Sequence, residues 1–222
     1  MPNPSPPEAL FLDRLPSPIG TMLVVHDAAR LRALEFDDCE ARLNELLRLH
    51  YGAYTLDEAR APERIRQSLA RYFAGDLRAI ECVEVATGGT PFQREVWAAL
   101  RRIPAGTTMS YGGVALQIGR PRSVRAVGAA NGDNPVSIVV PCHRVIGADG
   151  SLTGYGGGLA RKRWLLTHEG AALKATAASR ARDAIRLPAS GSRPAAPDRL
   201  RSREPRPDAD PRQSGPDRFR AP

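Results

Sequence analysis

The sequence predicts an α+β fold with two domains, residues 1–89 and 90–170, followed by a tail over residues 171–222. Three observations support this division. Short apolar runs separated by turn residues open the chain, whereas helical periodicity dominates after residue 89. The glycine pair in Ala86-Thr87-Gly88-Gly89 separates the two patterns. The charge also changes sign between the two halves of the chain.

The net charge of +8 is unevenly distributed along the sequence. Residues 1–89 contain 10 Lys and Arg against 14 Asp and Glu, whereas residues 90–170 contain 10 against 4 and residues 171–222 contain 12 against 6. The C-terminal half is therefore basic, which predicts an anionic partner for that half.

The first domain begins with three predicted strands, over residues 9–15, 21–26 and 31–36, which we expect to form a small antiparallel sheet. Two helices should follow, because apolar residues recur there at helical spacing. The residues that set this spacing are Leu43, Leu46, Leu47 and His50 in the first helix, and Ile65, Leu69, Tyr72 and Phe73 in the second. A short strand near residues 82–85 would complete the domain.

The second domain opens with a helix that has a strong start signal. Thr90 is a suitable N-cap, Pro91 suits the first helical position, and Gln93 can complete a capping box. Two short helices, over residues 111–118 and 122–131, are then joined by Gly119-Arg120-Pro121. This pair resembles a helix-turn-helix, although ordinary packing of a helical hairpin would explain the same pattern.

The β-branched run at residues 136–140 predicts a short strand that leads to Cys142. A glycine-rich loop over residues 154–158 and a final helix over residues 159–169 follow. Residues 171–222 contain few large apolar side chains, so we expect a disordered basic tail.

Several classes of protein are excluded by the sequence. No stretch approaches the roughly 18 apolar residues of a membrane span, and the N-terminus lacks the features of a secretory signal, so we expect a cytoplasmic protein. Cys39, Cys82 and Cys142 are odd in number, form no CxxC pair and lack metal-ligand spacing. We therefore expect no disulfide framework and no metal site, with Cys39 and Cys82 as packing residues.

Cys142 is the candidate nucleophile because His143 follows it directly. A thiol reacts as the thiolate, which requires a base or a positive field to lower its pKa. Neighbouring residues in a strand point to opposite faces, so the backbone has to turn at this point, or a water has to bridge the two side chains, for His143 to act as the base.

The motifs around Cys142 occur in a specific order: Ser110-Tyr111-Gly112, Arg125-Ala126-Val127-Gly128, Asn134-Pro135, Pro141-Cys142-His143-Arg144-Val145-Ile146, Gly154-Tyr155, Gly157-Gly158-Leu159, Leu165-Leu166 and Glu169. Together they resemble the O6-alkylguanine-DNA alkyltransferase family, also called the methylated-DNA–protein-cysteine methyltransferases. The resemblance covers residues 90–169 closely and the first domain only in general architecture. It implies a ribonuclease H-like first domain and a winged-helix-like second domain.

The resemblance also implies a reaction and a set of site residues. The Cys142 thiolate would accept an alkyl group from O6-alkylguanine once per protein molecule, with activity on O4-alkylthymine an open question. His143 would take the thiol proton through a water, Glu169 would orient His143, and Tyr111 would assist the leaving guanine. In the pocket, Asn134 would brace the turn, and Val145, Tyr155 and Gly156 would contact the base.

The implied partner is double-stranded DNA, bound through its minor groove by a monomer without a cofactor. Arg125 would fill the gap left by the flipped nucleotide, Ala126 and Gly128 would allow close approach, and Arg122 and Arg144 would contact the DNA. Two other interpretations remain. A sensor would bind alkylguanine without accepting the alkyl group, and a cysteine hydrolase would use Cys142 and His143 over many turnovers.

Overall fold

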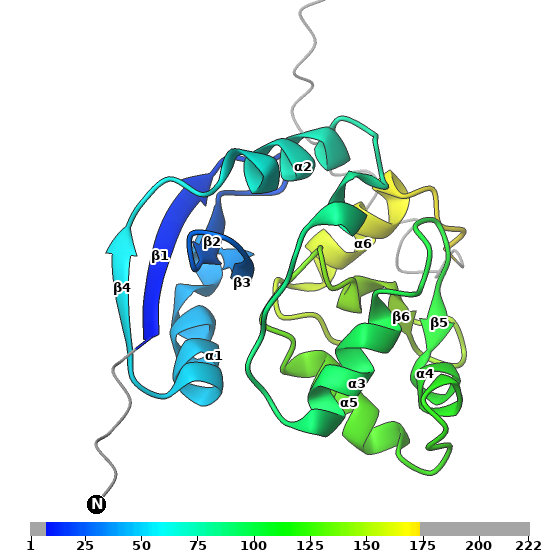
Figure 1. The fold of residues 1–222 in the computed structure, drawn as a ribbon. Helices are drawn as coiled ribbons and strands as arrows, with labels where there is room; N and C mark the ends of the chain where they lie inside the picture. Colours follow the sequence, from blue (N-terminus) through cyan, green and yellow to red (C-terminus); the bar gives the residue numbers. More distant parts are fainter. Residues whose placement is uncertain (1–7, 174–222) are drawn as a thin grey trace, which may run out of the picture. The chain divides into compact units, whose positions relative to one another are not determined.

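The computed structural model describes residues 8–173, and the N-terminal half of this range contains a four-stranded sheet (Figure 1). Its strands are β1 (Glu8–Leu15), β2 (Met22–His26), β3 (Leu31–Phe36) and β4 (Tyr54–Glu58), in the order β3-β2-β1-β4. The pairs β1–β2 and β2–β3 are antiparallel, as predicted, whereas β4 lies parallel to β1. The predicted purely antiparallel sheet is therefore a mixed sheet.

The sheet is buried on both faces because its apolar side chains alternate between two clusters. Leu23 and Val25 of β2 pack with Leu43 and Leu47 of α1 (Glu40–Tyr51). The neighbouring β2 residues face the opposite side, where the side chains of α2 (Glu63–Phe73) belong to the same cluster. Both helices lie where the sequence predicts them, because their apolar stripes each cover one face of the sheet.

The short strand predicted near residues 82–85 does not form. Residues Ala79–Cys82 make a 3₁₀ turn, and beyond them only Val85 makes a single bridge, to Leu31. The Val83 amide donates to the Ile80 carbonyl at 3.2 Å, so the backbone before Val85 is bonded within the turn. Around Val85, the Leu31 amide donates to the Glu84 carbonyl at 2.9 Å and the Ala86 amide donates to the Leu31 carbonyl at 3.0 Å, and the pairing with β3 ends there.

Four helices and one short strand pair form the second half: α3 (Pro91–Leu100), α4 (Tyr111–Gln117), α5 (Val124–Gly132), α6 (Leu159–His168), and the parallel pair β5 (Met109–Ser110) and β6 (Val145–Ile146). The predicted capping box is present at the start of α3. The Gln93 amide donates to Thr90 Oγ1 at 3.2 Å, and the Thr90 amide donates to Gln93 Oε1 at 2.9 Å.

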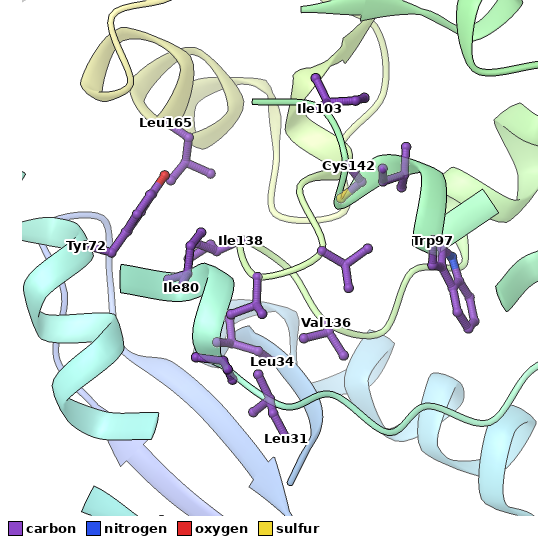
Figure 2. Close-up of a cluster of buried hydrophobic side chains, with 14 of the residues drawn as sticks. Leu31, Leu34, Tyr72, Ile80, Trp97, Ile103, Val136, Ile138, Cys142 and Leu165 are labelled. Carbon is purple, nitrogen blue, oxygen red and sulfur yellow. The ribbon is translucent and has the colours of Figure 1, made fainter. Parts of the chain in front are cut away.

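One hydrophobic cluster contains buried side chains from both halves of the chain (Figure 2). Leu31 and Leu34 of the sheet belong to it together with Trp97 of α3 and Leu165 of α6. The connection over residues 86–89 lies close to this core, since a Cβ on Gly89, which has a φ of +91°, would lie 2.7 Å from the Trp97 ring. A side chain at this position would therefore be strained and crowded.

Within residues 8–173, no helix is long and apolar enough to cross a membrane. The predicted disordered tail lies, from residue 174 onward, outside the described residues.

Candidate active site

Cys142 is carried by a loop, and the strand predicted over residues 136–140 is absent. Only Val136 makes a bridge, to Leu34 at the edge of β3. The Asn134 side chain satisfies much of the remaining backbone: its amide nitrogen donates to the Val140 carbonyl at 2.8 Å, and its oxygen accepts from the Val136 amide at 3.0 Å. Because a side chain takes the bonds that a partner strand would provide, the β-branched residues are buried in a turn. Ile138 in this turn has a φ of 71°.

The backbone turns at Cys142 itself, because residues Cys142–Arg144 form a 3₁₀ turn. Because of this turn, the side chains of Cys142 and His143 do not alternate as in a strand. A backbone turn is one of the two conditions under which His143 could act as the base for Cys142. The Cys142 side chain belongs to the buried cluster of Figure 2, and the residue is 5% exposed. Burial raises the pKa of the Cys142 thiol, while the Asn134 side chain and the positive charge of Lys162 lower it.

Cys142 lines a cavity of about 250 Å³. The other residues of its wall are Arg42, Tyr111, Gly128, Asn131, Gly132, Ser137, Gly154, Tyr155 and Gly156. The cavity therefore brings together Cys142, Tyr111, Gly128, Tyr155 and Gly156 from the predicted site. Arg42 comes from α1, so the first half of the chain also contributes to the wall.

His143 is fully buried and is fixed by Glu169, which caps the C-terminus of α6. His143 Nε2 lies 2.9 Å from Glu169 Oε1. Burial lowers the pKa of His143 more than the neighbouring carboxylate raises it, so the neutral ring is favoured. In the neutral ring, Nε2 donates to Glu169 and Nδ1 carries the lone pair. Among residues 8–173, Nδ1 has no hydrogen-bond partner.

Glu169 accepts hydrogen bonds from two further residues. The Tyr72 hydroxyl donates to Oε1 at 2.8 Å, and Arg144 donates through Nη2 to Oε1 at 2.8 Å and through Nε to Oε2 at 2.9 Å. Burial alone would raise the pKa of the Glu169 carboxyl, but the bonds from His143 and Arg144 hold that pKa well below its usual range. Glu169 is thus a buried carboxylate.

Arg144 does not lie where a DNA contact is predicted. Its side chain is 7% exposed, and besides the bonds to Glu169 it donates to the Ile103 carbonyl at 2.6 Å. A guanidinium with these partners is unavailable to phosphate, so Arg144 neutralises Glu169 inside the protein instead. The sequence motif places Arg144 correctly beside His143 but gives no indication of its burial.

The remaining predicted DNA-binding residues lie on or beside α5, and one face of this helix is exposed. Arg122, Arg125 and Ala126 are exposed, and Gly128 is half-buried under the Tyr111 ring. The opposite face of α5 is buried, and the Trp97 indole donates to the Ala130 carbonyl at 2.7 Å. Within the described part of the chain, Arg122 and Arg125 form no ion pair.

Tyr111 and Tyr155 occupy the cavity wall in different environments. The Tyr111 hydroxyl accepts a hydrogen bond from Thr153 at 3.1 Å. The Tyr155 hydroxyl is buried without a partner among residues 8–173, and its ring meets the edge of His143 with centroids 6.4 Å apart. Val145 lies on β6 and does not line the cavity, and its carbonyl accepts from Lys162.

Sequence reasoning missed the part that four residues play around this site, the charged Glu35, Arg42 and Lys162 and the neutral hydrogen-bond donor Tyr72. Glu35 is fully buried, pairs with Arg42 and accepts from the Ser137 hydroxyl at 3.0 Å. Lys162 had a usable signal, because it precedes Leu165 and Leu166 by three and four residues and so lies on the buried face of α6. The described residues contain no group of three or more His, Cys, Asp or Glu suited to a metal ion.

Comparisons with known proteins agree on one family. The family profile described as "6-O-methylguanine DNA methyltransferase, DNA binding domain" matches residues 91–171. The methylated-DNA–protein-cysteine methyltransferase of Salmonella typhimurium is 55% identical over 164 residues, which cover 72% of this chain and 96% of that protein. The protein of the same name from Methanosarcina acetivorans is 44% identical over 154 residues, covering 69% of this chain and 94% of the relative.

Solved structures show the same likeness. The crystal structure of Mycobacterium tuberculosis OGT in complex with DNA is 40% identical and has a TM-score of 0.60, covering 73% of this chain and 92% of that chain. The O6-methylguanine-DNA methyltransferase of Pyrococcus kodakaraensis is 28% identical with a TM-score of 0.56, covering 72% of this chain and 99% of that one. Both matches support a mixed α and β fold with a small sheet.

Proposed function

This chain belongs to the methylated-DNA–protein-cysteine methyltransferase family, and we propose that it repairs DNA by moving an alkyl group from O6 of a guanine to Cys142. The observation that carries this proposal is the arrangement around the cavity. A buried cysteine lines it, and the adjacent imidazole is fixed by a carboxylate 2.9 Å away. A nucleophile, a base and a residue that orients the base are the groups that activation of a thiol requires.

The first step forms the thiolate. Because Nε2 of His143 donates to Glu169, the lone pair on Nδ1 is the one available to accept a proton. The Cys142 proton passes to this nitrogen through a water, and the Glu169 carboxylate stabilises the resulting imidazolium. His143 is thus the base and Glu169 the residue that orients it.

The second step transfers the alkyl group. The Cys142 sulfur attacks the alkyl carbon, so that a carbon–sulfur bond forms while the carbon–O6 bond breaks and its electron pair moves to O6. The Tyr111 hydroxyl donates a hydrogen bond or a proton to the leaving purine. The thioether product has no good leaving group, so each protein molecule reacts once.

DNA binding is assigned to the helix-turn-helix formed by α4 and α5. Its exposed residues Arg122 and Arg125 supply positive charge, and the small residues Ala126 and Gly128 allow α5 to approach the minor groove closely. The alkylated nucleotide rotates out of the duplex, and Arg125 fills the gap. The supporting observation is that α5 passes beside the cavity through Gly128.

The flipped base is held by the cavity wall. Asn134 braces the loop that carries Cys142, as its three hydrogen bonds to Val136 and Val140 support. The Val145 carbonyl has a second lone pair, and the Tyr155 ring and the Gly156 backbone complete the contact with guanine. These contacts support alkylguanine as the substrate that we propose for the cavity.

The finer organisation also belongs to the proposal. Residues 1–89 form a ribonuclease H-like domain, residues 90–170 a winged-helix-like DNA-binding and alkyl-transfer domain, and residues 171–222 a basic tail. The protein acts as a monomer in the cytoplasm, with DNA as its partner.

Intact-protein mass spectrometry tests the proposal. The protein is incubated with a duplex that contains O6-methylguanine, and the modified peptide is then mapped. We expect a gain of one methylene mass per protein at Cys142, together with restored guanine in the duplex. The variant Cys82→Ser, which changes an exposed thiol, should react like the wild type, whereas Cys142→Ala should gain no mass.

Two outcomes would contradict the proposal. Tight binding to the alkylated duplex without any gain of mass would indicate a sensor. Repeated turnover without a stable adduct would indicate a hydrolase. An unmodified duplex serves as the control for adventitious alkylation.

A further inference from the structure

We propose that the buried Lys162 ammonium is the counter-charge of the Cys142 thiolate and thereby promotes ionisation of the nucleophile. This inference rests on the proposed function, in which Cys142 reacts as a thiolate. Lys162 does not contact the reacting atoms in the structure, so it acts as a positioning residue whose effect is electrostatic.

The Lys162 side chain is held in the protein interior by carbonyl groups alone. The residue is 0% exposed, and its Nζ donates to the Val145 and Thr153 carbonyls at 2.6 Å and to the Gly154 carbonyl at 3.3 Å. Val145 lies three residues after Cys142, and Thr153 and Gly154 lead into the glycine loop. Lys162 therefore joins two segments that border the Cys142 cavity.

The other charges around Cys142 are already paired within the protein. Glu169 pairs with Arg144, Glu35 with Arg42, and Asp38 with Arg161. The neutral state is favoured for His143, and the high pKa of Tyr155 keeps its hydroxyl protonated. Tyr111 is hydrogen-bonded to the Thr153 hydroxyl. Among residues 8–173, Lys162 alone in this set has no carboxylate partner.

The charge count is therefore completed when Cys142 ionises. With a neutral thiol the buried Lys162 ammonium has no anion, and a thiolate at Cys142 supplies one. A buried ammonium without an anion is costly, and burial accordingly lowers the pKa of Lys162 to about 8, whereas negative charge on Cys142 raises that pKa. In the opposite direction, Lys162 lowers the pKa of the Cys142 thiol. The two ionisations favour each other, as linkage requires.

The first test measures thiolate formation without DNA. Iodoacetamide reacts with the thiolate, and mass spectrometry of the Cys142 peptide gives the rate as a function of pH in the wild type, Lys162→Met and Lys162→Gln. We expect the rate at pH 7.5 to fall at least about tenfold in both variants, which corresponds to a rise of one unit in the thiol pKa. Arg163→Met, which removes a charge from the next position of α6, should leave the inflection unchanged.

A purely structural role gives a different profile. It would lower the rate by the same factor at every pH and leave the inflection where the wild type has it, and this result would overturn the proposal. Methyl transfer from an O6-methylguanine duplex by the wild type is measured in parallel. Failure of that reaction would contradict the proposed function, while the iodoacetamide profiles would still decide the role of Lys162.

The second test leaves Lys162 intact and so does not depend on whether its variants fold. Lys162 and Lys174 are the only lysines in the sequence, so ¹³C labelling of lysine Cε gives two resonances. We expect Lys162 to titrate at a higher pH in the wild type than in Cys142→Ser, because only the wild type can place a thiolate nearby. Equal titration of Lys162 in the two proteins would overturn the proposal.

Discussion

The ion pair between Arg144 and Glu169 predicts an unusual pattern of stability in a double-mutant cycle. Both side chains are buried, and two hydrogen bonds, of 2.8 and 2.9 Å, join them. Replacing Glu169 by Gln removes the negative charge and leaves the Arg144 guanidinium buried without an anion. Breaking a buried pair in this way costs about 3 to 5 kcal/mol of unfolding free energy. Glutamine retains an acceptor for Tyr72 and His143, so we expect a loss of about 3 kcal/mol, at the lower end of this range.

The double variant Arg144→Met, Glu169→Gln should be more stable than Glu169→Gln alone. Methionine fills much of the volume of the guanidinium stem, and no uncompensated charge remains. The expected coupling is about 2 to 3 kcal/mol. Urea unfolding followed by tryptophan fluorescence measures all four proteins, and an unchanged m-value shows that the denatured state is comparable. Additivity within about 0.5 kcal/mol would refute the conclusion that the two side chains act as a pair.

Three further predictions concern pH, DNA binding and helix capping. The pKa of buried His143 lies below its ordinary value of 6.5, so the unfolded chain binds the proton more readily, and the unfolding free energy should fall as the pH drops below 6.5. Calorimetry should show a weaker pH dependence of stability in His143→Gln. The same pH dependence in both proteins would contradict the lowered pKa of His143. Arg125→Ala should weaken DNA binding and reduce the salt slope by about 1, as fluorescence anisotropy can measure, without changing the iodoacetamide reactivity of Cys142. Thr90→Ala should lower the unfolding free energy by about 1 kcal/mol through loss of the cap, and a loss below about 0.3 kcal/mol in urea titrations would show that the capping box is unimportant.

The elements that sequence predicts well are those whose signals are local. The strands β1 to β3 are bounded by turn residues, and α3 begins with a capping box whose two bonds involve residues three positions apart. β4 (Tyr54–Glu58) was missed because it is a half-exposed edge strand with polar residues between its apolar ones, and its parallel partner β1 lies more than forty positions earlier. Its pairing is a tertiary property that no local pattern reports.

The two wrongly predicted strands have a common physical cause. At residues 82–85 and 136–140, β-branched and other apolar residues are buried by tertiary contacts, and each segment makes only one bridge to β3. Apart from the hydrogen bonds at that bridge, the first segment is bonded within a 3₁₀ turn and the second by the Asn134 side chain. In both segments the apolar side chains are buried although the backbone does not pair along a strand. A prediction from strand propensity fails there because it takes buried β-branched residues as a sign of strand pairing.

The candidate site shows the same limit for charged residues. Cys142 and His143 can be identified from the sequence motif because they are adjacent. The environment of Arg144 depends on Glu169, which lies 25 positions later. A charged residue is expected at the surface unless its partner is known, so a DNA contact was the reasonable expectation for Arg144. For Lys162 the helical spacing indicates burial, but its partners are backbone carbonyls that only the fold brings together.

The two buried cations have separate consequences for the base and the nucleophile. Arg144 neutralises Glu169 and lowers the pKa of His143, so it favours a neutral imidazole that can accept a proton. Lys162 has no carboxylate to neutralise among the described residues, so its charge remains available to Cys142. Placing one cation on the carboxylate and the other near the thiol therefore gives the Cys142 thiolate a counter-charge, while Glu169 holds the imidazole that accepts the proton.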